Sequence, residues 1–171
     1  TGGHKPVDIA ILRLPRISNF TDFAPLERHQ ALGVRYVNTV QELGQPDLVI
    51  LPGTKNTMGD LLWMRQNGLE AGVKQLAARG VPVLGVCGGY QMLGKKLQDP
   101  EAVEHGGEMD GMGLLPSETV FSSQKVRTRV SGEVAFPPLA GAKLEGYEIH
   151  MGRTLVSCSP FCTLSDGQPE G

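Results

Sequence analysis

The stretch that decides the fold is Val81-Pro82-Val83-Leu84-Gly85-Val86-Cys87-Gly88-Gly89-Tyr90-Gln91. Its first half is apolar and rich in β-branched residues, which is typical of a buried strand, and residues 90–97 are compatible with a helix. Between them, Gly85-x-Cys87-x-Gly89 has the spacing of a nucleophile elbow, in which flanking glycines permit a strained backbone. The sequence therefore predicts a strand, a tight turn with Cys87 at its apex, and a helix.

The segments upstream of this stretch alternate between apolar strands and helices. Strands are predicted at 7–12, 33–37 and 46–51. One helix, for which residues 54–60 can supply the N-cap, is predicted to carry Leu61, Leu62 and Met64, and another is predicted at 69–78. Such alternation indicates a parallel sheet with helices on both faces. Beyond Asp99 we expect a Gly-rich acidic loop at 101–113 and short, antiparallel strands at 119–121, 126–130, 133–136 and 146–152. The predicted fold is thus a three-layer α/β domain with a mostly parallel central sheet and added short antiparallel strands in its C-terminal part.

Composition limits the classes of protein to which the chain can belong. With 171 residues, 40% of them hydrophobic and 20% charged, the chain has the size and balance of one soluble globular domain. A formal net charge of −2 without any basic cluster argues against a nucleic-acid or anionic-membrane partner. No apolar run is long enough for a membrane span, and no leader resembles a signal peptide.

The cysteines and the chain ends add two further expectations. Three cysteines without a disulfide-scaffold density favour reduced thiols, so we expect a cytoplasmic protein. The chain opens at Thr1 without a methionine and closes on a turn-like sequence at Gly171. We therefore expect residues 1–171 to be one domain of a longer protein, truncated at its C-terminal end.

Cys87 is the strongest candidate for a catalytic residue. At the start of a helix its thiolate would be stabilised by the positive end of the helix dipole, so we expect a lowered pKa. A cysteine that attacks an acyl carbon needs hydrogen-bond donors for the oxyanion. The backbone N–H of Gly88 follows the nucleophile directly, and Gly53 ends the neighbouring predicted strand at the same carboxyl edge of the sheet. We expect these two glycines to form the oxyanion hole.

An ordered set of segments resembles the glutamine amidotransferase domain of the cobyric acid synthase family. The set comprises Leu14-Pro15-Arg16-Ile17-Ser18-Asn19-Phe20-Thr21-Asp22-Phe23, Leu51-Pro52-Gly53-Thr54-Lys55-Asn56-Thr57, the Cys87 elbow, Gly113-Leu114-Leu115-Pro116-Ser117-Glu118-Thr119-Val120 and Gly146-Tyr147-Glu148-Ile149-His150-Met151-Gly152-Arg153-Thr154. The elbow is common to all triad-type amidotransferases, whereas the ordered set is specific and covers nearly the whole chain. The resemblance implies a flavodoxin-like fold of the class I glutamine amidotransferases.

The resemblance also implies a reaction and a partner. Cys87 would attack the side-chain amide of glutamine, form a γ-glutamyl thioester and release ammonia, and Gln91 would help to hold the glutamine. In the family, the ammonia passes to an N-terminal ATP-dependent synthetase domain of the same polypeptide, which amidates carboxylates of a corrinoid, cobyrinic acid a,c-diamide, in cobalamin biosynthesis. We therefore expect no cofactor in this domain, and expect ATP and Mg²⁺ only in the synthetase domain, which these residues do not include.

A cysteine nucleophile also requires a general base, usually histidine. Three of the four histidines, His4, His29 and His105, have the sequence surroundings of surface residues. His150 lies in the Gly-Tyr-Glu-Ile-His segment, but the residue two positions later is Gly152, where a His-x-Glu motif would have glutamate. In the family the catalytic histidine belongs to a later Tyr-Leu-His-Gly type motif. We therefore interpret His150 as a structural residue or a wall residue of the glutamine site, and expect the base beyond Gly171.

Other residues and other functions remain as weaker possibilities. Lys125, Arg127 and Arg129 alternate along one strand face, and one of them could bind the glutamine α-carboxylate, although a solvated face is the simpler interpretation. Cys158 and Cys162 lack partners at metal-ligand spacing, so we expect no metal site. Three other functions stay open: an amidotransferase subunit for peptidoglycan lipid II amidation, a cobyrinic acid a,c-diamide synthase, and a catalytically silent α/β scaffold.

Overall fold

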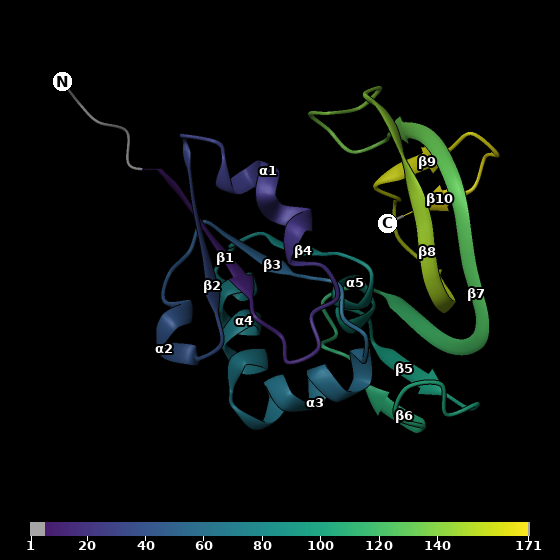
Figure 1. The fold of residues 1–171 in the computed structure, drawn as a ribbon, viewed down its shortest axis with the longest axis horizontal. Helices are drawn as coiled ribbons and strands as arrows, with labels where there is room; N and C mark the ends of the chain where they lie inside the picture. The colour runs from purple at the N-terminus through teal and green to yellow at the C-terminus, as the bar shows by residue number, and fades with distance from the viewer. Residues whose placement is uncertain (1–5, 171) are drawn as a thin grey trace.

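The computed structural model describes residues 6–170. Four strands form a parallel sheet in the order β2-β1-β3-β4: β1 (Val7–Leu12), β2 (Leu32–Val37), β3 (Leu48–Leu51) and β4 (Val83–Gly85) (Figure 1). Successive side chains of β1 point to opposite faces, so Ala10 and Leu12 enter one core while Ile9 and Ile11 enter another. The expected α/β class with a parallel sheet is confirmed.

Helices cover both faces of this sheet. On one face lie α2 (Val40–Leu43), α3 (Thr57–Gln66), α4 (Leu69–Ala78) and α5 (Gly88–Met92), which contribute to the larger core. On the other face, η1 (Phe20–Phe23) and α1 (Ala24–Glu27) pack Phe23 and Leu26 against the sheet. Among residues 54–60, expected to supply the N-cap, it is Asn56 that caps α3, because its side chain accepts a hydrogen bond from the Gly59 N–H at 2.8 Å. None of the described helices is both long and apolar enough to cross a membrane.

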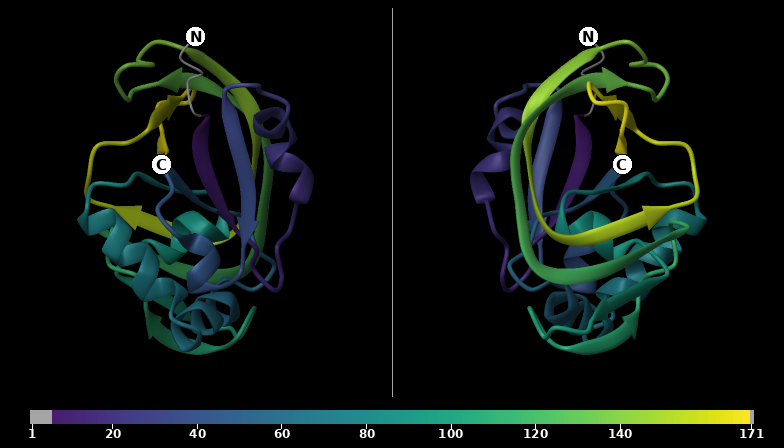
Figure 2. Two further views of the ribbon diagram at one scale, coloured as in Figure 1. Left: turned by 90° about the vertical axis from the view of Figure 1, so that its left-hand side faces the viewer. Right: turned by 90° about the vertical axis from the view of Figure 1, so that its right-hand side faces the viewer.

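A second, mixed sheet follows the elbow. It contains β5 (Lys96–Asp99), β6 (Gly107–Asp110), β7 (Ser117–Val134), β8 (Lys143–Val156), β9 (Cys162–Leu164) and β10 (Pro169–Glu170). Its order is β10-β9-β7-β5-β6, and β8 pairs with β7. Antiparallel strands were expected here, but β7 has 18 residues and β8 has 14, and the two form a long curved ribbon beside the α/β layer (Figure 2). The expected separate strands at 119–121 and 126–130 are parts of β7, and of the one expected at 133–136 only Glu133 and Val134 belong to β7.

Two boundaries near the elbow differ from expectation. The helix after Cys87 ends at Met92 rather than at Leu97, and β5 begins at Lys96. The reason is a close backbone approach at Gly94, where a Cβ would lie 2.6 Å from the Ser117 carbonyl oxygen, so the chain passes directly into the second sheet. The expected acidic loop at 101–113 contains strand β6, which pairs with β5.

The strand before Cys87, β4, is also less buried than expected. Among the strands of residues 6–170, β4 pairs only with β3, so it forms one edge of the parallel sheet. The side chain of Leu84 is consequently 46% exposed. The prediction of a buried strand was wrong at this point, because an apolar run of this length does not distinguish an edge strand from a central one.

Candidate active site

Cys87 occupies a strained turn between β4 and α5. Its backbone has φ 51° and ψ −113°, and a positive φ is uncommon for a residue with a side chain. Gly85 and Gly89 make the turn possible: a Cβ on Gly85 would lie 2.5 Å from the Cα of Tyr90, and a Cβ on Gly89 would lie 2.0 Å from the carbonyl oxygen of Leu51. The elbow predicted from the glycine spacing is therefore present, and its glycines are required by close packing.

The two glycines proposed from the sequence both lie next to Cys87. Gly53 follows the end of β3, and a Cβ built on it would be 3.6 Å from the Cβ of Cys87. Gly88 is the first residue of α5 and directly follows Cys87. Gly53 is buried, its carbonyl accepts from Ser18 N–H at 3.0 Å, and within residues 6–170 its own N–H has no acceptor. A buried, unpaired N–H beside a thiol is a ready donor for an anion that forms there.

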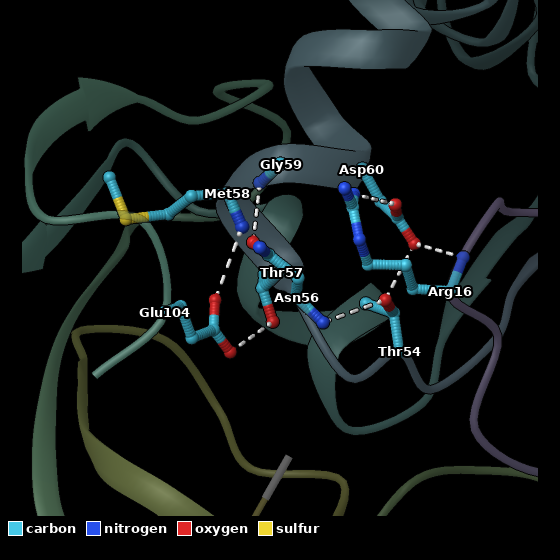
Figure 3. A network of polar contacts seen from close by, with 8 residues as sticks. All are labelled: Arg16, Thr54, Asn56, Thr57, Met58, Gly59, Asp60 and Glu104. Carbon is cyan, nitrogen blue, oxygen red and sulfur yellow. Dashed lines mark hydrogen bonds and ion pairs between the residues drawn. The ribbon is translucent and has the colours of Figure 1, made fainter. Parts of the chain in front are cut away.

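Gln91 lies one turn further along α5 and is buried. Thr57 connects it to a carboxylate that the sequence did not single out: the Thr57 hydroxyl lies 3.4 Å from Gln91 Oε1 and 3.3 Å from Glu104 Oε1. The second oxygen of Glu104 accepts from the Met58 N–H at 3.3 Å (Figure 3). Burial raises the pKa of Glu104, although the bonds from Met58 and Thr57 oppose the rise. A carboxylate therefore lies beside the amide of Gln91.

Glu104 is held in place by Asp99, at the end of β5. The Asp99 carboxylate is 1% exposed and accepts backbone hydrogen bonds of 2.8–3.0 Å from four residues, Val103, Glu104, His105 and Gly106. Burial alone would raise the Asp99 pKa, but the four bonds outweigh it and the pKa is lowered. The segment interpreted as an acidic loop is thus a fixed turn that delivers Glu104 to the site.

The sulfur of Cys87 has a different electrostatic environment from the one expected. Burial raises the pKa of the Cys87 thiol, and the carboxyl groups of Glu104 and Asp22 raise it further, while the hydrogen bond from the Gly88 N–H lowers it. The net pKa is raised, so the expectation of a thiolate stabilised by the helix dipole was wrong. Helix α5 has only five residues and supplies few aligned peptide dipoles. The thiol also lies 3.7 Å from the Ile149 carbonyl oxygen of β8, to which it can donate.

Alkylation of Cys87 by iodoacetamide should therefore require a higher pH than alkylation of a cysteine in a short peptide, because only the thiolate reacts. The Glu104→Gln variant should shift the midpoint downward, since it removes a negative charge near the sulfur. Mass spectrometry of the Cys87 peptide as a function of pH measures both midpoints. A Cys87 midpoint at or below that of the peptide would contradict the raised pKa.

The histidine of the Gly-Tyr-Glu-Ile-His segment is engaged elsewhere. His150 Nε2 lies 2.6 Å from Glu148 Oε1, and Nδ1 lies 3.0 Å from the Gly152 carbonyl oxygen. Both ring nitrogens thus face acceptors other than Cys87. No histidine of residues 6–170 forms a hydrogen bond with the Cys87 sulfur, and His4 lies outside the described residues.

The other candidate residues do not join the site. Lys125, Arg127 and Arg129 are exposed on one face of β7, and Arg129 pairs with Glu145 at 3.2 Å on that surface. Cys158 and Cys162 are free thiols, the first exposed and the second buried. The described residues include no group of three or more His, Cys, Asp or Glu side chains that could hold a metal ion.

Comparison with known proteins identifies the family. The model of the CobB/CobQ-like glutamine amidotransferase domain matches residues 8–171. The chain belongs to this family. It is 60% identical over 153 residues to a cobyric acid synthase of Ruminiclostridium cellulolyticum, covering 86% of this chain and 30% of that protein. It is 51% identical over 173 residues to a cobyric acid synthase of Moorella thermoacetica, covering 98% of this chain and 32% of that protein. The domain thus spans about a third of the length of these curated relatives.

Solved structures share the fold of this amidotransferase domain. The structure of PurLQS from Thermotoga maritima matches with a TM-score of 0.70 at 20% sequence identity, over 95% of this chain and 76% of that chain. A solved glutamine amidotransferase also matches, with a TM-score of 0.67 at 17% sequence identity over 94% of this chain and 82% of that chain, and this agreement confirms the expected class I glutamine amidotransferase architecture. The residues that sequence reasoning missed are Thr57 and Glu104. A helix N-terminus facing a Gly-rich acidic turn was their only sequence signal, and it did not specify a contact.

Proposed function

We propose that this domain hydrolyses glutamine at Cys87. The thiolate attacks the side-chain amide carbon, and the N–H groups of Gly53 and Gly88 stabilise the resulting oxyanion. The C–N bond then breaks, the leaving nitrogen takes a proton and departs as ammonia, and water cleaves the γ-glutamyl thioester to glutamate. The observation that carries the proposal is the position of a strained, positive-φ Cys87 between two buried glycines, one with an unpaired N–H.

We further propose that Gln91, Thr57 and Glu104 bind the substrate. Their side chains form a connected polar group next to the elbow, and Glu104 is the negative charge among them. A partly buried carboxylate there is suited to accept hydrogen bonds from the α-ammonium group of glutamine. Binding of that cation would also offset the burial that raises the Glu104 pKa.

We propose that the general base is a residue other than His150. Support comes from the two contacts of its ring, with Glu148 and with the Gly152 carbonyl, which occupy both nitrogens. The Glu148–His150 pair instead stiffens the part of β8 whose Ile149 carbonyl lies next to Cys87. His150 would then shape the wall of the site.

For the whole protein, we propose cobyric acid synthase activity in the cytoplasm. Ammonia from this domain would serve an N-terminal synthetase domain of the same polypeptide, which uses ATP and Mg²⁺ to amidate carboxylates of cobyrinic acid a,c-diamide. The names of the relatives support this acceptor over lipid II or the a,c-diamide synthase reaction, and their threefold greater length leaves room for such a domain.

A glutamine-derived diazoketone tests the glutaminase. It should label Cys87 with saturation kinetics and spare Cys158 and Cys162, whereas a silent scaffold would show no preference.

The Glu104→Gln variant should raise the half-saturating concentration of the diazoketone by about tenfold or more, because a hydrogen bond to a charged group contributes ~1.5–3 kcal/mol. Glu108→Gln is the matched control, since Glu108 lies on β6 and pairs with Lys96. Equal saturation in both variants would refute the role of Glu104.

A further inference from the structure

Thr54 contacts both glycines of the proposed oxyanion hole. It directly follows Gly53 in the chain. A Cβ built on Gly88 would lie 2.8 Å from the Thr54 Cγ2 atom and 3.3 Å from the Thr54 nitrogen, so the methyl group of Thr54 packs on the other donor. A movement of Thr54 would therefore change the separation between the two N–H groups.

The position of Thr54 is fixed by a buried carboxylate. Asp60, in the first turn of α3, is 0% exposed and accepts the Thr54 hydroxyl at 2.6 Å (Figure 3). It also accepts the Arg16 backbone N–H at 3.1 Å and the Arg16 Nη1 at 3.2 Å. We refer to Arg16, Thr54 and Asp60 together as the Asp60 clamp.

Backbone contacts join the same two loops. Ile17 and Thr54 form an antiparallel bridge, Ser18 N–H donates to the Gly53 carbonyl at 3.0 Å, and Lys55 N–H donates to the Arg16 carbonyl at 2.9 Å. The loop after β1 therefore lies along the loop after β3, and the clamp is the only side-chain link between them that ends on a fully buried charge within the described residues. The orientation of the Gly53 peptide depends on both loops.

We infer that Asp60 and Thr54 are positioning residues for the oxyanion hole. The clamp holds Gly53 while Thr54 spaces it from Gly88, so that both N–H groups can point to one oxyanion. The Arg16 guanidinium has a second effect, because it offsets the charge of Asp60, which would otherwise oppose a developing negative charge nearby. The inference rests on the proposed glutaminase reaction and adds residues that touch neither the substrate nor the nucleophile.

The test compares isosteric variants in the whole protein. Thr54→Val keeps the methyl group against Gly88 and loses the hydroxyl, and Asp60→Asn keeps the shape and loses the charge. Each should lower kcat for glutamine hydrolysis about tenfold to hundredfold, since loss of one oxyanion donor costs about 10²–10³-fold. KM should change less than about threefold, because the interaction strengthens only in the transition state. Thr54→Ser, which keeps the hydroxyl, should recover most of the loss.

Glu70→Gln is the matched control. Glu70 is also a buried carboxylate in the first turn of a helix, 8% exposed and paired with Arg65 at 2.6 Å, and neither residue forms a hydrogen bond with Gly53, Thr54, Cys87 or Gly88 within residues 6–170. It should leave kcat unchanged. Iodoacetamide alkylation of Cys87, which needs no oxyanion hole, should proceed at the wild-type rate in Thr54→Val.

The outcomes separate the two proposals. If wild-type protein hydrolyses glutamine and Thr54→Val does so equally fast, the positioning role is wrong. A changed alkylation rate of Cys87 in Thr54→Val, or an equal kcat loss in Glu70→Gln, would also overturn it, because either result indicates an effect that is not confined to the oxyanion hole. If the wild-type protein releases no glutamate from glutamine, the proposed function fails, and this inference fails with it.

Discussion

Replacing Cys87 with alanine should reduce ammonia release from glutamine by about 10⁴-fold or more, because no other group can form the thioester. If the proposed synthetase activity is right, the whole protein carrying this change should still amidate its acceptor when free ammonia is supplied, because that reaction would not use Cys87. The measurement is glutamate formation from glutamine, compared with acceptor amidation supported by glutamine and by ammonium salts.

The His150→Ala variant tests whether His150 is needed for the reaction as Cys87 is. His150→Ala should cost far less than Cys87→Ala, because the His150 ring is bound to Glu148 and to the Gly152 carbonyl. Equal losses in the two variants would show that His150 is the base after all. Glutamine hydrolysis that persists in Cys87→Ala would refute the thioester mechanism altogether.

Replacing Gly89 with alanine should unfold the domain or destabilise it by roughly 3 kcal/mol or more, a value at the upper end of the cost of overpacking. A methyl group at this position would lie 2.0 Å from the Leu51 carbonyl oxygen, which belongs to β3 in the centre of the parallel sheet. Backbone atoms of a central strand cannot move away as a flexible side chain could. Urea unfolding followed by circular dichroism measures the loss.

Gly146→Ala is the control for this effect. Gly146 lies in β8, has no positive φ, and a Cβ built on it meets no atom within 4 Å. The free energy of unfolding of this variant should stay within about 0.5 kcal/mol of the wild-type value, as is usual for substitutions at open positions. A wild-type free energy of unfolding for Gly89→Ala as well would mean that the elbow can relax around an added methyl group.

The elbow could be predicted from sequence because its constraints are local. Gly85, Cys87 and Gly89 lie within five residues, and their spacing specifies the turn without knowledge of any distant residue. The proximity of Gly53 to Cys87 followed from topology, because both lie after adjacent parallel strands whose carboxyl ends meet at one edge. These two arguments placed Cys87 on the elbow and Gly53 beside it.

The features that escaped prediction depend on distant contacts. Glu104 reaches Thr57 only because the Asp99 carboxylate binds four backbone N–H groups of one turn, which composition does not reveal. The length of β7 depends on pairing with β8, and the end of α5 depends on the approach of Gly94 to Ser117. The raised pKa of Cys87 reflects burial and the carboxyl groups of two other segments.

The two backbone donors proposed beside Cys87 have a consequence for how such a site can evolve. The N–H groups of Gly53 and Gly88 belong to the main chain, so no single codon encodes their chemistry, and every residue except proline would supply the same atom. Evolution must instead preserve the backbone conformation of two turns, the one after β3 and the one after β4. On the proposed mechanism, selection should therefore also act on side chains such as Thr54 and Asp60, which fix the conformation of these turns.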